Sequence, residues 1–87
     1  MVDILQISDK IRQFIIQTSY IPAEQVKDDT LIFEQGIMDS MGFISIIGFL
    51  EDTFNVSPLD DELVEANFES IEAITNFVKR KVQIDYN

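Results

Sequence analysis

Histidine and cysteine are both absent from this 87-residue chain, and their absence excludes several kinds of chemistry. The chain offers no thiolate nucleophile, no imidazole base and none of the side chains that zinc binds best. A hydrolase of the Ser-His-Asp type is therefore excluded, and a zinc site of the usual kind is not expected. The lack of cysteine also rules out a disulfide and fits a reducing compartment.

Targeting and linker segments are also missing. The N-terminal stretch MVDILQISDK is interrupted by Asp3 and Asp9, so it is typical of neither a signal peptide nor a membrane span. No repeat, low-complexity tract or Gly/Ser linker divides the chain. We therefore expect residues 1–87 to form one domain in the cytoplasm, without membrane contact.

Basic residues are few, since six Lys and Arg stand against sixteen Asp and Glu, for a net charge of −10. Thirteen of the acidic residues, but only one basic residue, lie from Glu24 to Glu72. Such a charge repels nucleic acid and speeds association with basic proteins. Because acidity also serves solubility, charge alone does not establish a basic partner.

Apolar spacing predicts an all-α domain of four helices, the first over residues 3–18 and the last over about 70–82. In both, apolar side chains recur every three or four residues, which indicates one buried helix face. Ser70 is a candidate N-cap of the last helix, and the basic residues 79–81 suit its carboxyl end. The predicted buried positions are Ile4, Ile7, Ile11, Phe14, Ile15 and Thr18, then Ile71, Ile74, Phe77, Val78 and Val82.

The second helix is predicted from Asp39 or Ser40 to about Phe54, with either residue as its cap. Its apolar residues occupy more than one face, which predicts central burial with a partly exposed patch at Met41 and Ile44. Two glycines, at positions 42 and 48, each cost about 1 kcal/mol of helix propensity. They indicate close packing or the close approach of a ligand.

A short third helix is predicted from Pro58 to about Ala66, with Ser57 as its cap. The connection before the second helix, residues 22–38, is long for so small a domain, so its own apolar residues must anchor it. We expect Leu31 and Phe33 to be these anchors. Gly36 can supply a positive φ angle for a tight turn.

Ser40 is the candidate functional residue. A helix N-terminus presents free backbone N–H groups and a partial positive charge, so a phosphodiester on Ser40 is stabilised there. Nothing in the chain activates this hydroxyl, because there is no histidine and an exposed Asp39 is a weak base. Another enzyme must therefore modify it. Taken alone, Asp39 and Ser40 are better explained as a helix cap, because such a pair is common.

The residues around Ser40 favour modification. The run LIFEQGIMDSMG, residues 31–42, resembles the carrier-protein signature LF-x-x-G followed by two hydrophobic residues and DSL, whose Ser receives 4′-phosphopantetheine from coenzyme A. Further similarity lies at LEDTF (50–54), DDEL (60–63) and NFESI (67–71), so the resemblance covers most of the chain. The chain looks like an acyl or peptidyl carrier protein.

This resemblance implies a four-helix bundle with a short third helix that carries an acyl or aminoacyl thioester and catalyses nothing. Ser40 matches the attachment residue, and Asp39 matches the neighbour that helps the transferase place its magnesium ion. Regions that meet partner enzymes in the family match Met41, Ile44, Glu51, Asp52, Asp60, Asp61 and Glu62.

The implied partners of a monomeric carrier are a phosphopantetheinyl transferase and an enzyme that loads the cargo, either an adenylation enzyme or an acyltransferase. Downstream come synthase, oxidase or condensation enzymes. Fatty-acid carriers commonly have acidic residues at the positions of Gly42 and Ser45, and this chain has no acid at either position. The DSMG form looks closer to stand-alone D-alanyl or aminoacyl carriers and to carriers of specialised polyketide or nonribosomal peptide pathways.

Two other classes of protein can also be small, acidic and helical. An unmodified carrier-like domain could serve as an acidic adaptor for protein–protein interaction, with Ser40 a simple cap. A small calcium-binding protein would also be acidic, but no D-x-[DN]-x-[DN]-G loop occurs in the chain. The adaptor therefore stays as the alternative.

Overall fold

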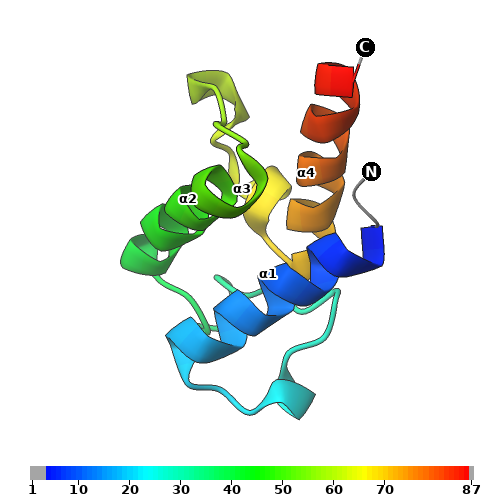
Figure 1. Cartoon of the computed structure of the whole chain (residues 1–87). Coiled ribbons are helices and arrows are strands. Elements are labelled where there is room, and N and C mark those ends of the chain that lie inside the picture. Colours follow the sequence, from blue (N-terminus) through cyan, green and yellow to red (C-terminus); the bar gives the residue numbers. More distant parts are fainter. Residues whose placement is uncertain (1–3, 87) are drawn as a thin grey trace.

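The computed structural model describes residues 4–86, in which helices are joined by loops and no strand occurs (Figure 1). Helix α4 packs against α1 and α3, and α1 also contacts α2. This arrangement confirms the predicted all-α four-helix bundle with a short third helix. In chain order the elements are α1 (Ile4–Ser19), the 3-10 turn η1 (Ala23–Gln25), α2 (Ser40–Phe54), the 3-10 turn η2 (Asp60–Glu62), α3 (Glu65–Phe68) and α4 (Ile71–Tyr86).

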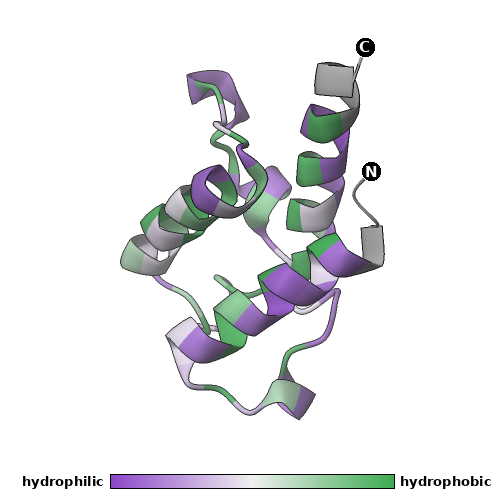
Figure 2. Cartoon of the chain, in the orientation of Figure 1, coloured by the Kyte–Doolittle hydropathy of each residue, from purple (hydrophilic) through white to green (hydrophobic). Residues whose placement is uncertain are grey.

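The core forms where the apolar faces of the helices meet, and Figure 2 shows the apolar side of α4 turned toward the rest of the bundle. Phe14 of α1 stacks on Phe49 of α2, with ring centroids 4.4 Å apart. Thr18 is exposed, so its predicted burial was wrong; it lies in the last turn of α1, beyond the packed face. The start predicted at Asp3 and the side chain of Ile4 lie outside the described residues. Buried as predicted are Ile7, Ile11, Ile15, Ile71, Ile74, Phe77 and Val78, while Val82 is partly buried.

The connection between α1 and α2 is anchored mainly by Ile32 and Met38, neither of which is one of the two predicted anchors, although the predicted Phe33 also packs against the core. Ile32 is fully buried and Met38 nearly so, whereas Leu31 and Phe33 are only partly buried. The Ile32 N–H donates to the carbonyl of Glu69 at 2.9 Å, and the Ile32 carbonyl accepts from the Met38 N–H at 2.9 Å. The prediction was wrong for Leu31, because the pairing with Glu69, two residues before α4, places Ile32 and not Leu31 in the core.

Polar contacts of Arg12 fasten the earlier part of the same connection to α1. The Arg12 guanidinium donates to the carbonyl of Val26 at 3.1 Å and pairs with the carboxylate of Asp28. The Asp28 carbonyl in turn accepts from the N–H of Glu72 at 2.9 Å, in the first turn of α4. Residues 26–28 are thus tied to both α1 and α4.

The predicted third helix is divided in the structure, so its limits of Pro58 and Ala66 were wrong. Leu63 and Val64 separate η2 from α3, and Val64 is extended, with φ −118° and ψ 151°. The β-branched side chain of Val64 favours this extended backbone. Ser57 caps neither segment; its hydroxyl donates to the Glu51 carboxylate at 3.3 Å.

Helix α4 is longer than predicted, because no Gly or Pro follows Val82 to end it. The basic residues Lys79, Arg80 and Lys81 therefore lie in the helix interior and not in its last turn, so their predicted place at the carboxyl end was wrong. Ser70 caps α4 as predicted, since its hydroxyl oxygen accepts from the N–H of Ala73 at 3.1 Å.

Candidate functional site

Ser40 is the first residue of α2, and its side chain is exposed. Asp39 precedes it in an extended conformation, and its carboxylate accepts from the N–H of Gly42 at 3.0 Å. Asp39 is therefore the N-cap, one of the two residues predicted for that role. The cap fixes the start of the helix and with it the backbone position of Ser40.

Two glycines shape the chain around Ser40. Gly36 has a φ of +78°, which confirms its predicted role, since L side chains rarely adopt this conformation. A Cβ on Gly42 would lie 2.8 Å from the sulfur of Met38 and 3.3 Å from its Cβ, so Gly42 packs closely against Met38, as expected. A Cβ on Gly48 would meet no atom within 4 Å, so the same expectation was wrong for that glycine.

An open groove with a volume of ≈ 630 Å³ lies beside Ser40. Residues on three separate segments line it: the connection before α2, the first turn of α2, and residues 63–65. Its lining residues are Phe33, Gly36, Met38, Asp39, Ser40, Phe43, Leu63 and Glu65. The lining of the groove is therefore mainly apolar, and Ser40 is one of its few polar residues.

Aromatic rings connect this groove with the core. Phe33 and Phe43 meet edge to face with their centroids 5.9 Å apart, and Phe43 meets the buried Phe68 in the same way at 5.3 Å. Phe68 then contacts Phe77 of α4 at 5.3 Å. Phe43, Leu63 and Glu65 were not predicted to belong to the site. Nothing in the local pattern around Leu63 and Glu65 shows that their segment lies beside the start of α2.

Backbone N–H groups at the start of α2 supply the positive end expected for a phosphate. Phe43 donates its N–H to the Asp39 carbonyl at 2.9 Å, and Gly42 donates to the Asp39 carboxylate. The backbone N–H groups of Ser40 and Met41 have no hydrogen-bond acceptor among the described residues. No acidic residue lies in the first turn of the helix.

The residues predicted to meet partners lie in different surroundings. Met41 and Ile44 are 70% and 61% exposed on α2, an unusual exposure for large apolar side chains. Asp52, Asp60 and Asp61 are also exposed. The other two have contacts within the chain: Glu51 accepts from the Ser57 hydroxyl, and Glu62 pairs with Lys81.

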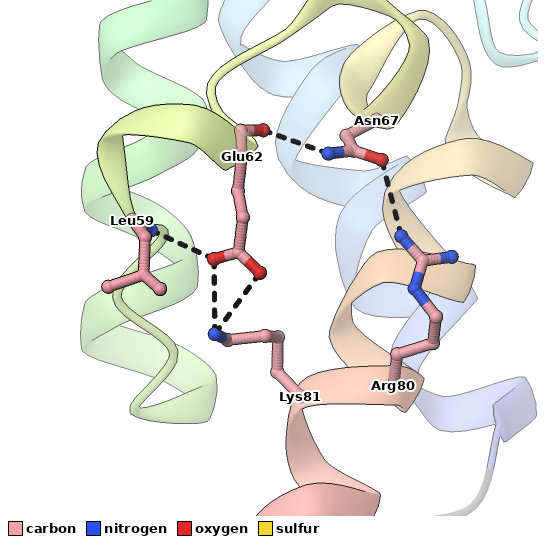
Figure 3. Close-up of polar contacts among 5 residues, drawn as sticks. All are labelled: Leu59, Glu62, Asn67, Arg80 and Lys81. Atoms are coloured by element: carbon pink, nitrogen blue, oxygen red, sulfur yellow. Dashed lines mark hydrogen bonds and ion pairs between the residues drawn. The ribbon is translucent and has the colours of Figure 1, made fainter.

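Glu62 is the most heavily bonded of these acids (Figure 3). Its carboxylate accepts from the backbone N–H of Leu59 at 2.9 Å and from the Lys81 ammonium at 3.1 and 3.3 Å. The Leu59 N–H, followed by Lys81, holds the pKa of the Glu62 carboxyl below its usual value of 4.5. The pairing with Lys81 spans nineteen residues and could not be read from the local sequence.

Metal-binding clusters and membrane-spanning helices are both missing from the part of the chain that the structure describes. No group of three or more acidic side chains is placed to hold a metal ion within residues 4–86. Over the same range, no helix has the length and apolar character needed to cross a membrane.

An exposed hydroxyl at a helix N-terminus, with its one neighbouring carboxylate committed to the cap, suits a group that another enzyme attaches. These features are those of a carrier domain. The comparison with protein families agrees: the chain matches the family described as the phosphopantetheine attachment site over residues 9–78, and it belongs to that family. The protein is therefore a non-catalytic carrier of 4′-phosphopantetheine, with a fold like that of acyl carrier proteins. A comparison with curated proteins gave no match.

Proposed function

We propose that Ser40 is the residue to which the 4′-phosphopantetheine arm is attached. The observation that carries this proposal is the position of Ser40: it is the first residue of α2, it is exposed, and it lines the groove. Several other serines are engaged within the chain. Ser19 donates to the Ile15 carbonyl, Ser57 donates to Glu51, and Ser70 caps α4.

The attachment step needs a transferase, because the chain has no histidine and the Asp39 carboxylate beside Ser40 accepts the capping bond from the Gly42 N–H. The Ser40 oxygen forms a bond to the phosphorus that carries the pantetheine part of coenzyme A. The anhydride bond of coenzyme A breaks, adenosine 3′,5′-bisphosphate leaves, and a base of the transferase takes the hydroxyl proton. Asp39 lies next to Ser40, where its carboxylate can help place the magnesium ion of the transferase.

The start of α2 suits the product of this step. A phosphodiester on Ser40 lies next to the N–H groups of Ser40 and Met41, which have no acceptor among the described residues, and the one carboxylate beside it, that of Asp39, is bonded to the Gly42 N–H. The groove beside Ser40 gives the arm a mainly apolar surface to lie against. The residues present therefore fit the group that the family carries.

We further propose that residues 1–87 act as one monomeric cytoplasmic carrier domain, whose arm holds an acyl or aminoacyl group as a thioester. The first half of α2 has no acid, while Met41 and Ile44 expose apolar surface there. This combination favours a carrier of a specialised polyketide or nonribosomal peptide pathway. The loading enzyme is then an adenylation enzyme or an acyltransferase, and synthase, oxidase or condensation enzymes follow.

We propose that these partners, the transferase included, dock on Met41 and Ile44 and on the exposed acids Asp52, Asp60 and Asp61. Exposed carboxylates raise the rate at which a basic partner associates, and salt screens that attraction. Transfer of cargo from a basic partner should therefore slow as ionic strength rises. A rate that does not change with salt would contradict the part assigned to the acids.

The attachment is tested by the intact mass of the protein after incubation with coenzyme A, Mg²⁺ and a broad-specificity phosphopantetheinyl transferase. We expect the wild type to gain the mass of one phosphopantetheine and Ser40→Ala to gain nothing. Ser45→Ala is the matched control, because Ser45 is also exposed on α2, and it should gain the same mass as the wild type. No gain in the wild type would favour the unmodified acidic adaptor.

A further inference from the structure

The segment after α2 has little hydrophobic anchoring. Val56 is buried at its start and Phe68 at its end, but no residue from 57 to 67 is buried. Leu59, Leu63 and Val64 are 60%, 37% and 47% exposed. Apolar burial therefore does not fix the course of this segment, and other contacts must do so.

Contacts of Glu62 and its neighbours provide that fixation (Figure 3). The Glu62 carboxylate joins the Leu59 N–H to the Lys81 ammonium of α4, and the Glu62 carbonyl accepts from the side-chain amide of Asn67 at 2.8 Å. The amide oxygen of Asn67 accepts from Arg80 at 3.2 Å. One residue thus ties η2 to both α3 and α4.

The ion pair in this set of contacts is partly shielded from water, since the side chains of Lys81 and Glu62 are 22% and 27% exposed. Asp60 and Asp61, in the same turn, are exposed. Such shielding makes the pair a better restraint than a fully exposed salt bridge.

The residue after Glu62 belongs to the groove beside Ser40. Leu63 lines it together with Glu65, and the Leu63 N–H bonds back to the Asp60 carbonyl at 3.3 Å. We propose that Glu62 is a positioning residue that holds Leu63 and Glu65 in place as one wall of this groove. This proposal rests on the proposed function in one respect: it takes the groove to be the surface beside the arm attached to Ser40.

Hydrogen exchange of the unmodified protein tests the tether. In Glu62→Ala, the amides of Leu63 and Asn67 should exchange on the order of tenfold faster, because local opening of the segment becomes easier. Glu62→Gln keeps an acceptor for the Leu59 N–H but loses the ion pair, so it should lie between Glu62→Ala and the wild type. The amides of Ile32 and Met38 serve as internal references and should not change. Asp61→Asn, a loss of charge in the same turn, should match the wild type.

Transferase kinetics then test the positioning role. We expect Glu62→Ala to raise KM for the carrier severalfold with little change in kcat, and Glu62→Gln, which keeps an acceptor for the Leu59 N–H, to raise KM less. Equal exchange in Glu62→Ala and Asp61→Asn would overturn the tether. Faster exchange with an unchanged KM would overturn the positioning of the groove. Failure of the wild type to accept phosphopantetheine would instead reject the proposed function, while the exchange rates would still judge the tether.

Discussion

The connection before α2, residues 20–39, and the one after it, residues 55–64, both contribute to the groove beside Ser40, yet different forces hold them. The first buries Val26, Ile32 and Met38, each no more than 5% exposed. The second buries only Val56, and bonds to Glu62 hold its far end. Both lie beside the same helix, but only the first is part of the core.

The two connections therefore contribute differently to a carrier: the first positions the residue that takes the arm, and the second forms the opposite wall of the groove. The residue that takes the arm must be presented in a fixed geometry, and buried side chains with backbone bonds provide that on the approach to Ser40. The opposite segment meets solvent and is held by charged groups, so its position depends on pH and salt. Three changes test this contrast, from the largest expected effect to the smallest.

Ile32→Ala and Leu63→Ala compare the two connections most directly. We expect Ile32→Ala to lower the free energy of unfolding by about 3 kcal/mol, because it leaves a cavity in the core. Leu63→Ala should cost less than about 1 kcal/mol, since Leu63 is already 37% exposed. Urea unfolding of both variants measures the difference. Similar losses in the two would show that the second connection is also part of the core.

Asp39, at the end of the first connection, combines a cap with a proposed role in modification. Asp39→Ala should lower the free energy of unfolding by about 1 kcal/mol through loss of the cap. Asp39→Asn keeps the cap, so its stability should stay near that of the wild type, while the rate of phosphopantetheine transfer falls on the order of tenfold. Urea unfolding and intact-mass time courses separate the two effects. An unchanged transfer rate in Asp39→Asn would leave Asp39 as a cap alone.

The smallest effect concerns pH and the second connection. Because folding lowers the pKa of Glu62, its ionised carboxylate adds stability above its usual value of 4.5, and this contribution is lost as the pH falls through the lowered pKa. The difference in unfolding free energy between wild type and Glu62→Gln should therefore be full at about pH 7 and shrink toward about pH 2. Urea unfolding across this range measures it.

Repeating this measurement in a protein that also carries Lys81→Met tests whether Lys81 is the partner of Glu62. The same comparison made in Lys81→Met should give a smaller difference at every pH, since Lys81 is one cause of the lowered pKa. A difference of the same size in both backgrounds would show that the ion pair with Lys81 contributes nothing.

Local patterns in the sequence sufficed for the helices that bury a face. The bounds of α2 follow from Asp39 as a cap and from the apolar run that ends at Phe54. The buried faces of α1 and α4 follow from their spacing, apart from Thr18 at the end of α1. Ser40 could be singled out because the cap, the helix start and the surrounding motif are contiguous in the chain.

Tertiary contacts decided what the sequence did not predict. Ile32 is an anchor because its backbone pairs with Glu69, and the turn at η2 is closed by a Glu62 side chain that also pairs with Lys81. Lys81 of α4 serves this pairing, and Arg80 bonds the side chain of Asn67. The contacts of Ile32 with Glu69 and of Glu62 with Lys81 join residues too distant in the chain for spacing or propensity to reveal.

The central claim, that Ser40 carries the arm, is tested most directly by locating the modification. The protein treated with coenzyme A and transferase would be digested, and its peptides sequenced by tandem mass spectrometry. The account predicts phosphopantetheine on Ser40 in all of the modified protein. Phosphopantetheine on Ser45, or on any other serine while Ser40 stays free, would contradict it.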